Sequence, residues 1–202
     1  MKFVLATANP GKIKELQILL SGLEIKIVTR DELDINIEID ETGTTFYENA
    51  FIKAETICKI SGLPSIADDS GLLVEALDNR PGVYASSFGG EDLTDTLRCE
   101  YLLTEMKAFP KMEQRRAKFV CTIVCVFPEG DILTATGECP GVITTVPCGS
   151  NGFGYDPVFL PDGMEKTMAQ LTSLEKNVLS HRGKALREFY ELLKSRKEGF
   201  NV

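Results

Sequence analysis

The chain has 202 residues, of which 43% are hydrophobic and 26% are charged. This composition suits one soluble globular domain, or two small lobes that share a cleft, and excludes a disordered tail or a collagen-like rod. Its 22 Lys and Arg residues against 30 Asp and Glu residues give a formal net charge of −8. That balance argues against nucleic acid or an anionic membrane as a partner, because both attract basic surfaces.

Targeting signals and metal-binding cysteines are missing from the sequence pattern. The first six residues hold too short an apolar run for a signal peptide, and the longest later apolar stretch, over 119–127, is less than half a membrane span. We therefore expect a cytoplasmic protein. The six cysteines form no Cys-x-x-Cys pair and the chain has one histidine, so we interpret the cysteines as reduced, mostly buried residues.

In the first third of the chain, short strands alternate with helices. A β-rich run over 2–6 precedes turn formers over 7–12. Helical spacing of apolar residues then predicts a helix that extends to Leu23, and alternation predicts strands over 24–29 and 34–39. A Thr45-x-x-Glu48 capping box opens a helix to about Ile60, before Ser61-Gly62.

The remaining two thirds continue the alternation. A short strand over 65–67 leads into Asp68-Asp69-Ser70-Gly71 and continues over 72–74. A turn over 79–82, a helix over 92–107, two strands over 118–126 and 132–137, a glycine-rich segment over 149–154 and a helix over 180–197 follow. The sequence therefore predicts a mixed α/β domain without an internal repeat or linker.

The first candidate site is the turn between the first strand and the first helix. It contains Thr7, Ala8, Asn9, Pro10, Gly11 and Lys12. Backbone N–H groups at a helix N-terminus, together with the helix dipole and a lysine, can bind phosphate. The turn is not a Walker A loop, because the first Gly of that pattern is absent and Ile13 replaces its hydroxyl residue. A structural turn capped by Asn9 is the alternative.

The second candidate is the pair Asp68 and Asp69. Adjacent carboxylates after an apolar strand raise each other's pKa, so they are costly unless they bind a cation or accept protons. A surface turn is the alternative. Asp69-Ser70-Gly71 also resembles the aspartic protease signature, but the chain has one copy, and Asp68 stands where that site has an apolar residue.

The third candidate lies on the predicted helix after Thr45. Asn49 and Lys53 are four residues apart and share a helix face, and Glu41 precedes the cap. Mg²⁺ bound to a phosphate substrate needs only one or two carboxylates, which Glu41, Asp68 and Asp69 could supply. The alternative is that Lys53 lies on a solvated helix face.

Two further candidates lie near the C-terminus. In Gly152-Phe153-Gly154-Tyr155-Asp156-Pro157 the glycines let the backbone approach a flat ligand, while Phe153 or Tyr155 offers a stacking face. A glycine-rich hairpin is the alternative there. Ser180-His181-Arg182-Gly183-Lys184, with Lys176 before it, gathers cations within an acidic chain. His181 and Arg182 could donate to an oxygen-bearing ligand, although a lone histidine is usually structural.

Taken together, these segments resemble the inosine triphosphate pyrophosphatase family, which hydrolyses non-canonical purine nucleoside triphosphates. The resemblance extends from Leu5 to Leu186 and includes every motif above, with Pro81-Gly82-Val83-Tyr84 in addition. The chain departs from the family pattern at Ser150-Asn151, where Thr-Gly is frequent. It also departs at Ala85-Ser86-Ser87-Phe88, where Ser-Ala-Arg-Tyr is common.

The resemblance implies a single domain over 1–202 with an elongated two-lobed α/β fold, a central mixed β-sheet flanked by helices, and an active-site cleft between the lobes. It also implies a homodimer. The implied reaction is Mg²⁺-dependent hydrolysis of ITP, dITP, XTP or dXTP to the nucleoside monophosphate and pyrophosphate. Asp69 would accept a proton and bind Mg²⁺ with Glu41 and Asp68. The substrate would contact residues 7–12, Lys53, Ser70, Phe153, Gly154, Tyr155, Asp156, Lys176, His181 and Arg182.

These roles give a mechanism in which Asp69 orients and deprotonates the attacking water, while Lys12 and Lys53 balance charge on the triphosphate. Donors from Arg182 and His181 would favour bases with an oxygen at C6 over adenine. Two alternatives stay open. One is a pyrophosphatase for other modified nucleotides, as in the related Maf-like proteins. The other is a nucleotide-binding sensor without turnover, against which the carboxylate cluster argues.

Overall fold

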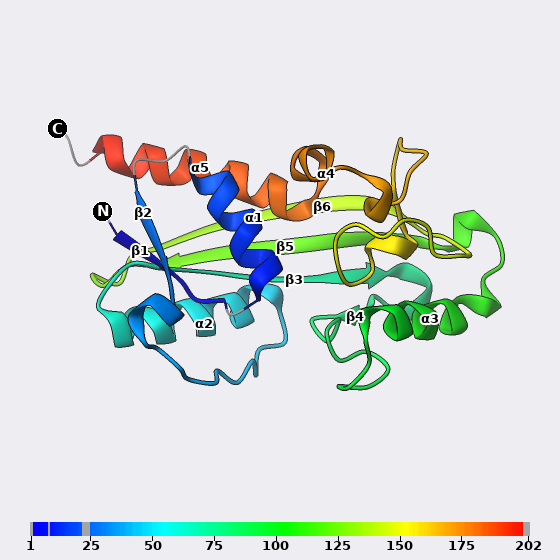
Figure 1. Ribbon diagram of the computed structural model, residues 1–202, viewed down its shortest axis with the longest axis horizontal. Coiled ribbons are helices and arrows are strands. Elements are labelled where there is room, and N and C mark those ends of the chain that lie inside the picture. Colours follow the sequence, from blue (N-terminus) through cyan, green and yellow to red (C-terminus); the bar gives the residue numbers. More distant parts are fainter. Residues whose placement is uncertain (1, 8, 22–24, 200–202) are drawn as a thin grey trace. The chain divides into compact units, whose positions relative to one another are not determined.

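The computed structural model describes residues 2–7, 9–21 and 25–199 (Figure 1). The strands are β1 (Lys2–Leu5), β2 (Lys26–Thr29), β3 (Ser65–Val74), β4 (Arg80–Gly82), β5 (Arg116–Val126), β6 (Ile132–Ile143) and β7 (Phe159–Pro161). The α-helices are α1 (Pro10–Leu20), α2 (Phe46–Ser61), α3 (Asp95–Glu105), α4 (Ser173–Leu179) and α5 (His181–Gly199). None of the helices in these described ranges is both long and apolar enough to span a membrane.

The strands form one mixed sheet in the order β2-β1-β3-β5-β6-β7, and β4 pairs with β3. β1 runs parallel to both β2 and β3, whereas β4 is antiparallel to β3 and β7 is antiparallel to β6. The parallel pairs follow from the intervening helices, because a parallel connection needs a crossover of a dozen or more residues. The predicted α/β class with a mixed sheet and flanking helices is therefore confirmed.

The chain divides into two compact units. Unit 1 comprises Met1–Asp69, Cys121–Gly137 and Arg182–Val202, and unit 2 comprises Ser70–Val120 and Glu138–His181. Each unit is assembled from segments that are far apart in sequence. This explains why the composition shows no boundary between them.

In unit 1, helices cover both faces of the sheet: α1 and α5 lie on one face and α2 lies on the other (Figure 1). The core of the α1/α5 face is built from Phe3, Leu5, Leu16, Leu20, Ile66, Cys121, Ile123, Ala185, Leu186 and Phe189, among others. The core of the α2 face includes Val4, Ala6, Ala50, Ala54, Ile57, Ala67 and Val124. Successive strand residues thus point to opposite faces, as the two-residue period of a strand requires.

Capping residues determine where the helices of unit 1 begin and end. Asn9 caps α1 and Pro10 occupies its first turn, where the missing N–H of proline costs nothing. Thr45 and Glu48 form the predicted capping box of α2, and Gly62 ends that helix in the left-handed conformation.

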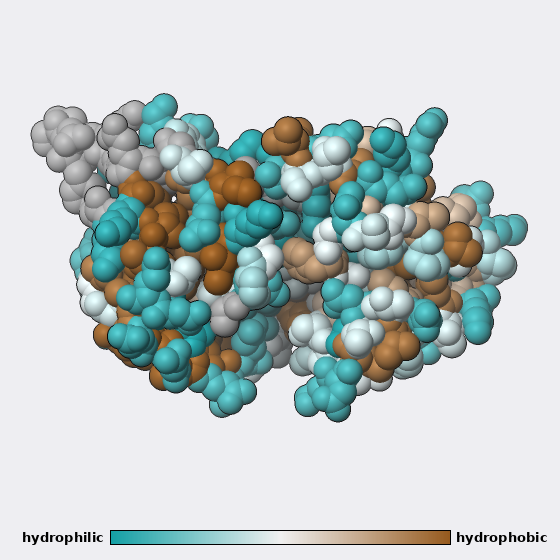
Figure 2. Space-filling model, in the orientation of Figure 1, coloured by the Kyte–Doolittle hydropathy of each residue, from teal (hydrophilic) through white to brown (hydrophobic). Residues whose placement is uncertain are grey.

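Apolar side chains lie between hydrophilic ones on the surface over α1 and α5 (Figure 2).

Unit 2 has its own core. Leu102 on α3, Phe119 on β5 and Phe159 on β7 are buried in one apolar cluster, and the Phe119 and Phe159 ring centroids are 4.5 Å apart. Two large apolar side chains of this helix, Leu97 and Tyr101, are exposed. The face of α3 that is buried carries Arg98, Cys99 and Leu102.

One sequence-based prediction and one alternative interpretation were wrong. Residues 34–39 form no strand: Ile35 and Ile39 pack against the α2 face, but no strand pairs with this segment, and Arg30 donates to the carbonyl of Ile37. The surface turn considered for residues 68–71 is also wrong, because these residues continue β3 without a break. Part of the predicted first helix, including Leu23, lies outside the described residues.

Candidate active site

The turn before α1 is organised by side-chain caps. The Asn9 carboxamide oxygen accepts from the backbone N–H groups of Gly11 (2.9 Å) and Lys12 (3.2 Å), and Thr7 Oγ1 accepts from Asn9 N–H (3.2 Å). Pro10 is exposed, and Ala8 lies outside the described residues. The backbone N–H groups that were expected to bind phosphate therefore belong to a helix N-terminus capped by Asn9. The alternative interpretation, a structural turn capped by Asn9, is thus confirmed.

Asp68 lies on the α1/α5 face, on the same side of β3 as Ile66. Its Oδ2 is 3.1 Å from Lys12 Nζ and 3.2 Å from Arg182 Nε, and the Cys121 thiol donates to the same oxygen at 3.9 Å. Asp68 Oδ1 has no hydrogen-bond partner among the described residues. Arg182 Nη1 also lies 2.6 Å from Glu15 Oε2 on α1.

The charges around Asp68 outweigh the cost of its burial. Burial alone would raise its pKa, because an apolar surrounding disfavours the ionised form. The positive charges of Lys12, Arg182 and Lys53 reverse that effect and hold the pKa of Asp68 well below its usual range. Asp68 is therefore stabilised in its charged form, and it holds Lys12 and Arg182 in position.

Asp69 points to the opposite side of β3, toward α2. Its Oδ1 is 3.4 Å from Lys53 Nζ, and its Oδ2 accepts from the Asn49 amide at 3.3 Å. Lys53 Nζ also lies 2.8 Å from Glu41 Oε2. The shared helix face of Asn49 and Lys53, predicted from their spacing, thus faces a buried carboxylate and not solvent.

Burial is the largest influence on Asp69, and it raises the pKa of this carboxyl. Lys53 and Lys12 act against the rise, whereas the negative charge of Glu41 supports it. For Lys53, burial lowers the pKa but Asp69 and Glu41 outweigh it, so the net pKa is raised and the ammonium stays charged. A carboxylate with a raised pKa beside fixed donors is suited to accepting a proton.

The segment between Glu41 and α2 approaches Asn49 closely. Gly43 donates its N–H to Asn49 Oδ1 at 2.8 Å. A Cβ on Gly43 would lie 2.6 Å from that same oxygen, so only glycine fits there. This contact positions Asn49 and brings Glu41 to Lys53.

The arrangement of carboxylates can be compared with what Mg²⁺ requires. The carboxylates of Glu41 and Asp69 both lie within ion-pair distance of Lys53 Nζ, so they are close enough to share one positive charge. Carboxylate oxygens are also the ligands that Mg²⁺ prefers. Asp68 lies with Lys12 and Arg182 instead. Within the described part of the chain, no group of three or more His, Cys, Asp and Glu residues is arranged to hold a metal. The residues present fit a metal that takes two carboxylate ligands, Glu41 and Asp69, from the protein.

The predicted glycine-rich segment in unit 2 is a loop held by side-chain contacts. Asp156 Oδ2 accepts from Phe153 N–H at 3.0 Å and lies 2.7 Å from Lys176 Nζ, which in turn is 4.8 Å from the centroid of the Phe153 ring. Gly152 has φ +81°, and a Cβ there would overlap Asp156 Oδ2. Phe153 is 36% exposed, so the loop presents an aromatic side chain on a backbone that Asp156 holds.

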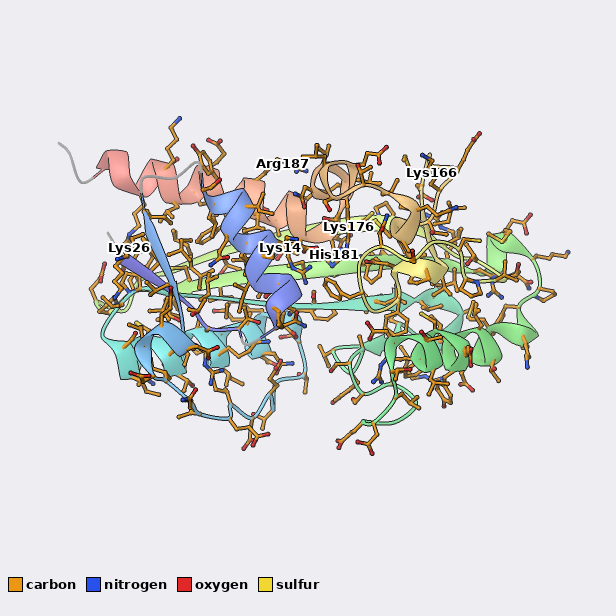
Figure 3. All side chains as sticks on the ribbon, viewed as in Figure 1. Lys14, Lys26, Lys166, Lys176, His181 and Arg187 are labelled. Carbon is orange, nitrogen blue, oxygen red and sulfur yellow. The ribbon has the colours of Figure 1, made fainter. Side chains whose placement is uncertain are left out.

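The other residues expected to bind the substrate have more buried positions. Tyr155 donates its hydroxyl to the Ala85 carbonyl at 2.8 Å, and burial raises its pKa. His181 stacks on Phe119 at 4.7 Å between centroids. Figure 3 shows that Lys176 and His181 come from α4 and from the first residue of α5. Ser70 is half-buried on β3.

Several residues in these networks were not found from the sequence. Glu15 pairs with Arg182 across 167 positions, and Cys121 contacts Asp68 across 53. Gly154 donates its N–H to Asp95 Oδ2 at 2.7 Å, and its carbonyl accepts from the Cys99 thiol at 3.3 Å. No local pattern indicates such pairs, because each links segments that are remote in sequence.

The chain is similar throughout to proteins of one family. The sequence profile of the Ham1 family matches residues 3–192. The dITP/XTP pyrophosphatase of Escherichia coli strain K12 is 45% identical over 196 residues, which is 96% of this chain and 98% of that protein. The enzyme of the same name from Bacillus subtilis strain 168 is 43% identical over 192 residues, covering 95% and 96%.

Solved structures agree with these sequence matches. A Ham1 protein from Coxiella burnetii has a TM-score of 0.89 and 41% identity, covering 96% of this chain and 99% of its own. A nucleoside-triphosphatase / dITP/XTP pyrophosphatase from Mycobacterium abscessus has a TM-score of 0.76 and 39% identity, covering 94% and 98%.

Proposed function

The chain belongs to the Ham1 family, and from this premise we propose that it hydrolyses the non-canonical purine nucleoside triphosphates dITP, ITP, XTP and dXTP. Water attacks, the bond between the α and β phosphates breaks, and the products are the nucleoside monophosphate and pyrophosphate. This activity removes deaminated purines from the nucleotide pool. The activities for which the related enzymes are named support the reaction class, and the surroundings of Asp69 support the chemistry.

The observation that carries the proposal is the position of Asp69. Its carboxyl is buried, its pKa is raised, and Asn49 and Lys53 hold it in one orientation. In the proposed mechanism, Asp69 orients the attacking water and takes its proton as the new P–O bond forms. Asn49 and Lys53 keep that carboxylate in place during proton transfer.

Positive charge for the triphosphate comes from the chain and from a proposed metal. Lys53 lies beside Asp69, and Lys12 is held by Asp68, so both ammonium groups can neutralise charge on phosphate oxygens. Glu41 and Asp69 would hold Mg²⁺, which when bound supplies further positive charge to the leaving pyrophosphate. Residues 7–12 and Ser70 complete the proposed phosphate contacts.

Residues of unit 2 are proposed to contact the nucleoside. Phe153 offers its exposed ring for stacking on a purine, and Lys176 and Asp156 offer polar atoms beside it. Gly154 and Tyr155 belong to the same loop, and His181, which stacks on Phe119, is proposed to contact the nucleoside as well. Arg182 was expected to donate to the base. Its side chain is 2% exposed and is paired with Asp68 and Glu15, so we propose that Arg182 positions Asp68 instead.

A substrate panel tests the proposal. Steady-state kcat/KM should be higher for ITP, dITP and XTP than for ATP by about 10²-fold or more, because a donor such as His181 finds no acceptor at C6 of adenine. Equal rates for ATP, or preference for modified pyrimidine triphosphates, would favour the broader nucleotide specificity of Maf-like enzymes. Binding of ITP without turnover would identify a sensor and overturn the proposal.

Removal of divalent cations tests the metal. We expect EDTA to abolish turnover of ITP and added Mg²⁺ to restore it, with no loss of folded structure by circular dichroism. Turnover that persists in EDTA after exhaustive dialysis would refute the metal requirement and leave the hydrolysis itself in place.

The assembly and the partners are also proposals. We propose a homodimer in the cytoplasm that binds neither nucleic acid nor membrane, on the basis of the acidic composition and the family resemblance. Light scattering at micromolar concentration should give twice the mass of one chain. A monomer mass at full activity would contradict the dimer.

A further inference from the structure

The loop that carries Phe153 is held from two directions by hydrogen bonds to its backbone. Asp156 Oδ2 accepts from the N–H of Phe153, and Asp95 Oδ2 accepts from the N–H of Gly154. These two N–H groups directly precede and follow the Cα–C unit of Phe153 along the backbone. Carboxylate acceptors make such bonds short and strong, so the φ and ψ angles of Phe153 are fixed by two side chains from different elements.

The next carbonyl is held as well. The Cys99 thiol, one helical turn after Asp95, donates to the Gly154 carbonyl at 3.3 Å. Burial raises the pKa of this thiol to about 12, so it remains a neutral donor at physiological pH. Gly154 is therefore anchored at both its N–H and its C=O by two residues of α3.

α3 itself is a firm support. Thr94 caps the helix by accepting from Leu97 N–H at 3.3 Å. Arg98 is buried and donates to the carbonyls of Phe88, Gly90 and Leu93 at 2.8 to 3.0 Å, which fixes the segment before the helix. The first turn of α3 thus has a defined position from which to hold the loop.

We propose that Asp95 and Cys99 are positioning residues that preorganise the Phe153 ring for stacking on the purine base. The inference rests on the proposed function, in which Phe153 contacts the base. A ring held before binding loses less conformational freedom when the base stacks on it, and this increases affinity. The phosphates of the substrate gain nothing from this support.

Product binding separates this role from a structural one. Calorimetric titration of the wild type and of Asp95→Ala measures the affinity for each of the two products, IMP and pyrophosphate, separately. We expect Asp95→Ala to weaken IMP binding by about 5- to 10-fold, the size expected when a preorganised contact is loosened. Pyrophosphate binding should stay within about 2-fold, a shift near the limit of what such titrations resolve.

Conservative variants distinguish the hydrogen bond from the charge. Asp95→Asn and Asp95→Ala both remove the negative charge from the first turn of α3, and so weaken its dipole interaction equally. Only Asn retains an acceptor for Gly154 N–H, so Asp95→Asn should bind IMP nearly as well as the wild type. The matched control is Asp92→Ala, because Asp92 is an exposed acidic residue before the helix. This variant should not change the affinity for IMP.

A second pair of variants tests the other anchor if Asp95→Ala does not fold. Cys99→Ser retains a donor and Cys99→Ala removes it, with a similar loss of volume. Cys99→Ala should weaken IMP binding more than Cys99→Ser. Because both anchors act on one loop, the effects of Asp95→Ala and Cys99→Ala should be less than additive in the double variant.

Each contrary result overturns the inference. Unchanged IMP affinity in Asp95→Ala, equal weakening of IMP and pyrophosphate, or Asp95→Asn as weak as Asp95→Ala would each do so. Failure of the wild type to bind IMP would also overturn it, whatever the rate of ITP hydrolysis. If the wild type binds IMP but releases no pyrophosphate from ITP, the proposed function fails and the titrations still decide the roles of Asp95 and Cys99.

Discussion

Asp68 and Asp69 are neighbours on β3, yet they point to opposite faces of the sheet in unit 1, and their pKa values shift in opposite directions. On the α1/α5 face, Asp68 is fully buried between Lys12 and Arg182, and its pKa is lowered. On the α2 face, Asp69 keeps about 10% of its side chain exposed, has longer contacts to Lys53 and Asn49, and its pKa is raised. One face uses a carboxylate to hold cations in place, and the other holds a carboxylate whose pKa is raised.

The two-residue period of a strand explains how adjacent residues come to differ so much. Side chains of successive residues point to opposite faces, so each carboxylate meets a different set of helices. Mutual repulsion between adjacent carboxylates, which the sequence pattern indicates, is reduced because the strand separates them. Variants on each face test whether the division between stability and reactivity is real.

The largest effect should come from Asp68→Asn. Removing one member of a buried charge network leaves Lys12 and Arg182 without their common partner, so we expect a loss of about 3–5 kcal/mol in the free energy of unfolding. Denaturant unfolding measures this loss. A change below about 1 kcal/mol, typical of an exposed pair, would show that Asp68 does not organise its face.

Asp69→Asn should produce the opposite pattern. We expect kcat for ITP to fall by about 10²-fold or more, because the proposed general base is lost. The free energy of unfolding should stay within about 1 kcal/mol of the wild type, since a neutral amide is easier to bury than a carboxylate. Wild-type kcat in this variant would refute the assignment of Asp69 as proton acceptor.

Asn49→Ala should have an intermediate effect on the α2 face. The variant removes a donor to Asp69 and leaves the Gly43 N–H without its acceptor, so we expect a loss of about 1–3 kcal/mol in stability and about 10-fold in kcat. Glu55→Ala, on the same helix in an exposed pair with Lys59, serves as the control and should change neither quantity. If both variants behave alike, Asn49 has no special relation to Asp69.

The smallest effect should come from Arg116→Ala. Arg116 makes a two-pronged pair with Asp162 at 2.7 and 2.8 Å, but the side chains are 39% and 45% exposed. Exposed pairs contribute about 0–1 kcal/mol, and unfolding measurements should give a loss in that range. A loss as large as that of Asp68→Asn would mean that burial is not what distinguishes the two pairs.

How much could be predicted from the sequence depends on the range over which a signal acts. Caps and motifs are local, so the start of α2 at Thr45, the end at Gly62 and the candidate residues along the chain followed from sequence. α4 was missed, although Thr172 and Glu175 form a capping box of the same kind as Thr45 and Glu48. That signal was present and could have identified the helix.

Other features have no local signal. Alternation over 34–39 reports where apolar side chains point and not whether a neighbouring strand exists, so the predicted strand was wrong. The pairs Arg182 with Glu15 and Gly154 with Asp95 join residues 167 and 59 positions apart. The opposite orientations of Asp68 and Asp69 follow from the strand period only once 65–74 is known to be a single strand.

The central claim is that this chain cleaves the bond between the α and β phosphates with Asp69 as the proton acceptor. Phosphorus NMR of ITP with Mg²⁺ and enzyme tests it most directly. We expect IMP and pyrophosphate in equal amounts with the wild type, and the same products at a rate lower by about 10²-fold or more with Asp69→Asn. Formation of IDP and inorganic phosphate, or an unchanged rate in the variant, would contradict the account.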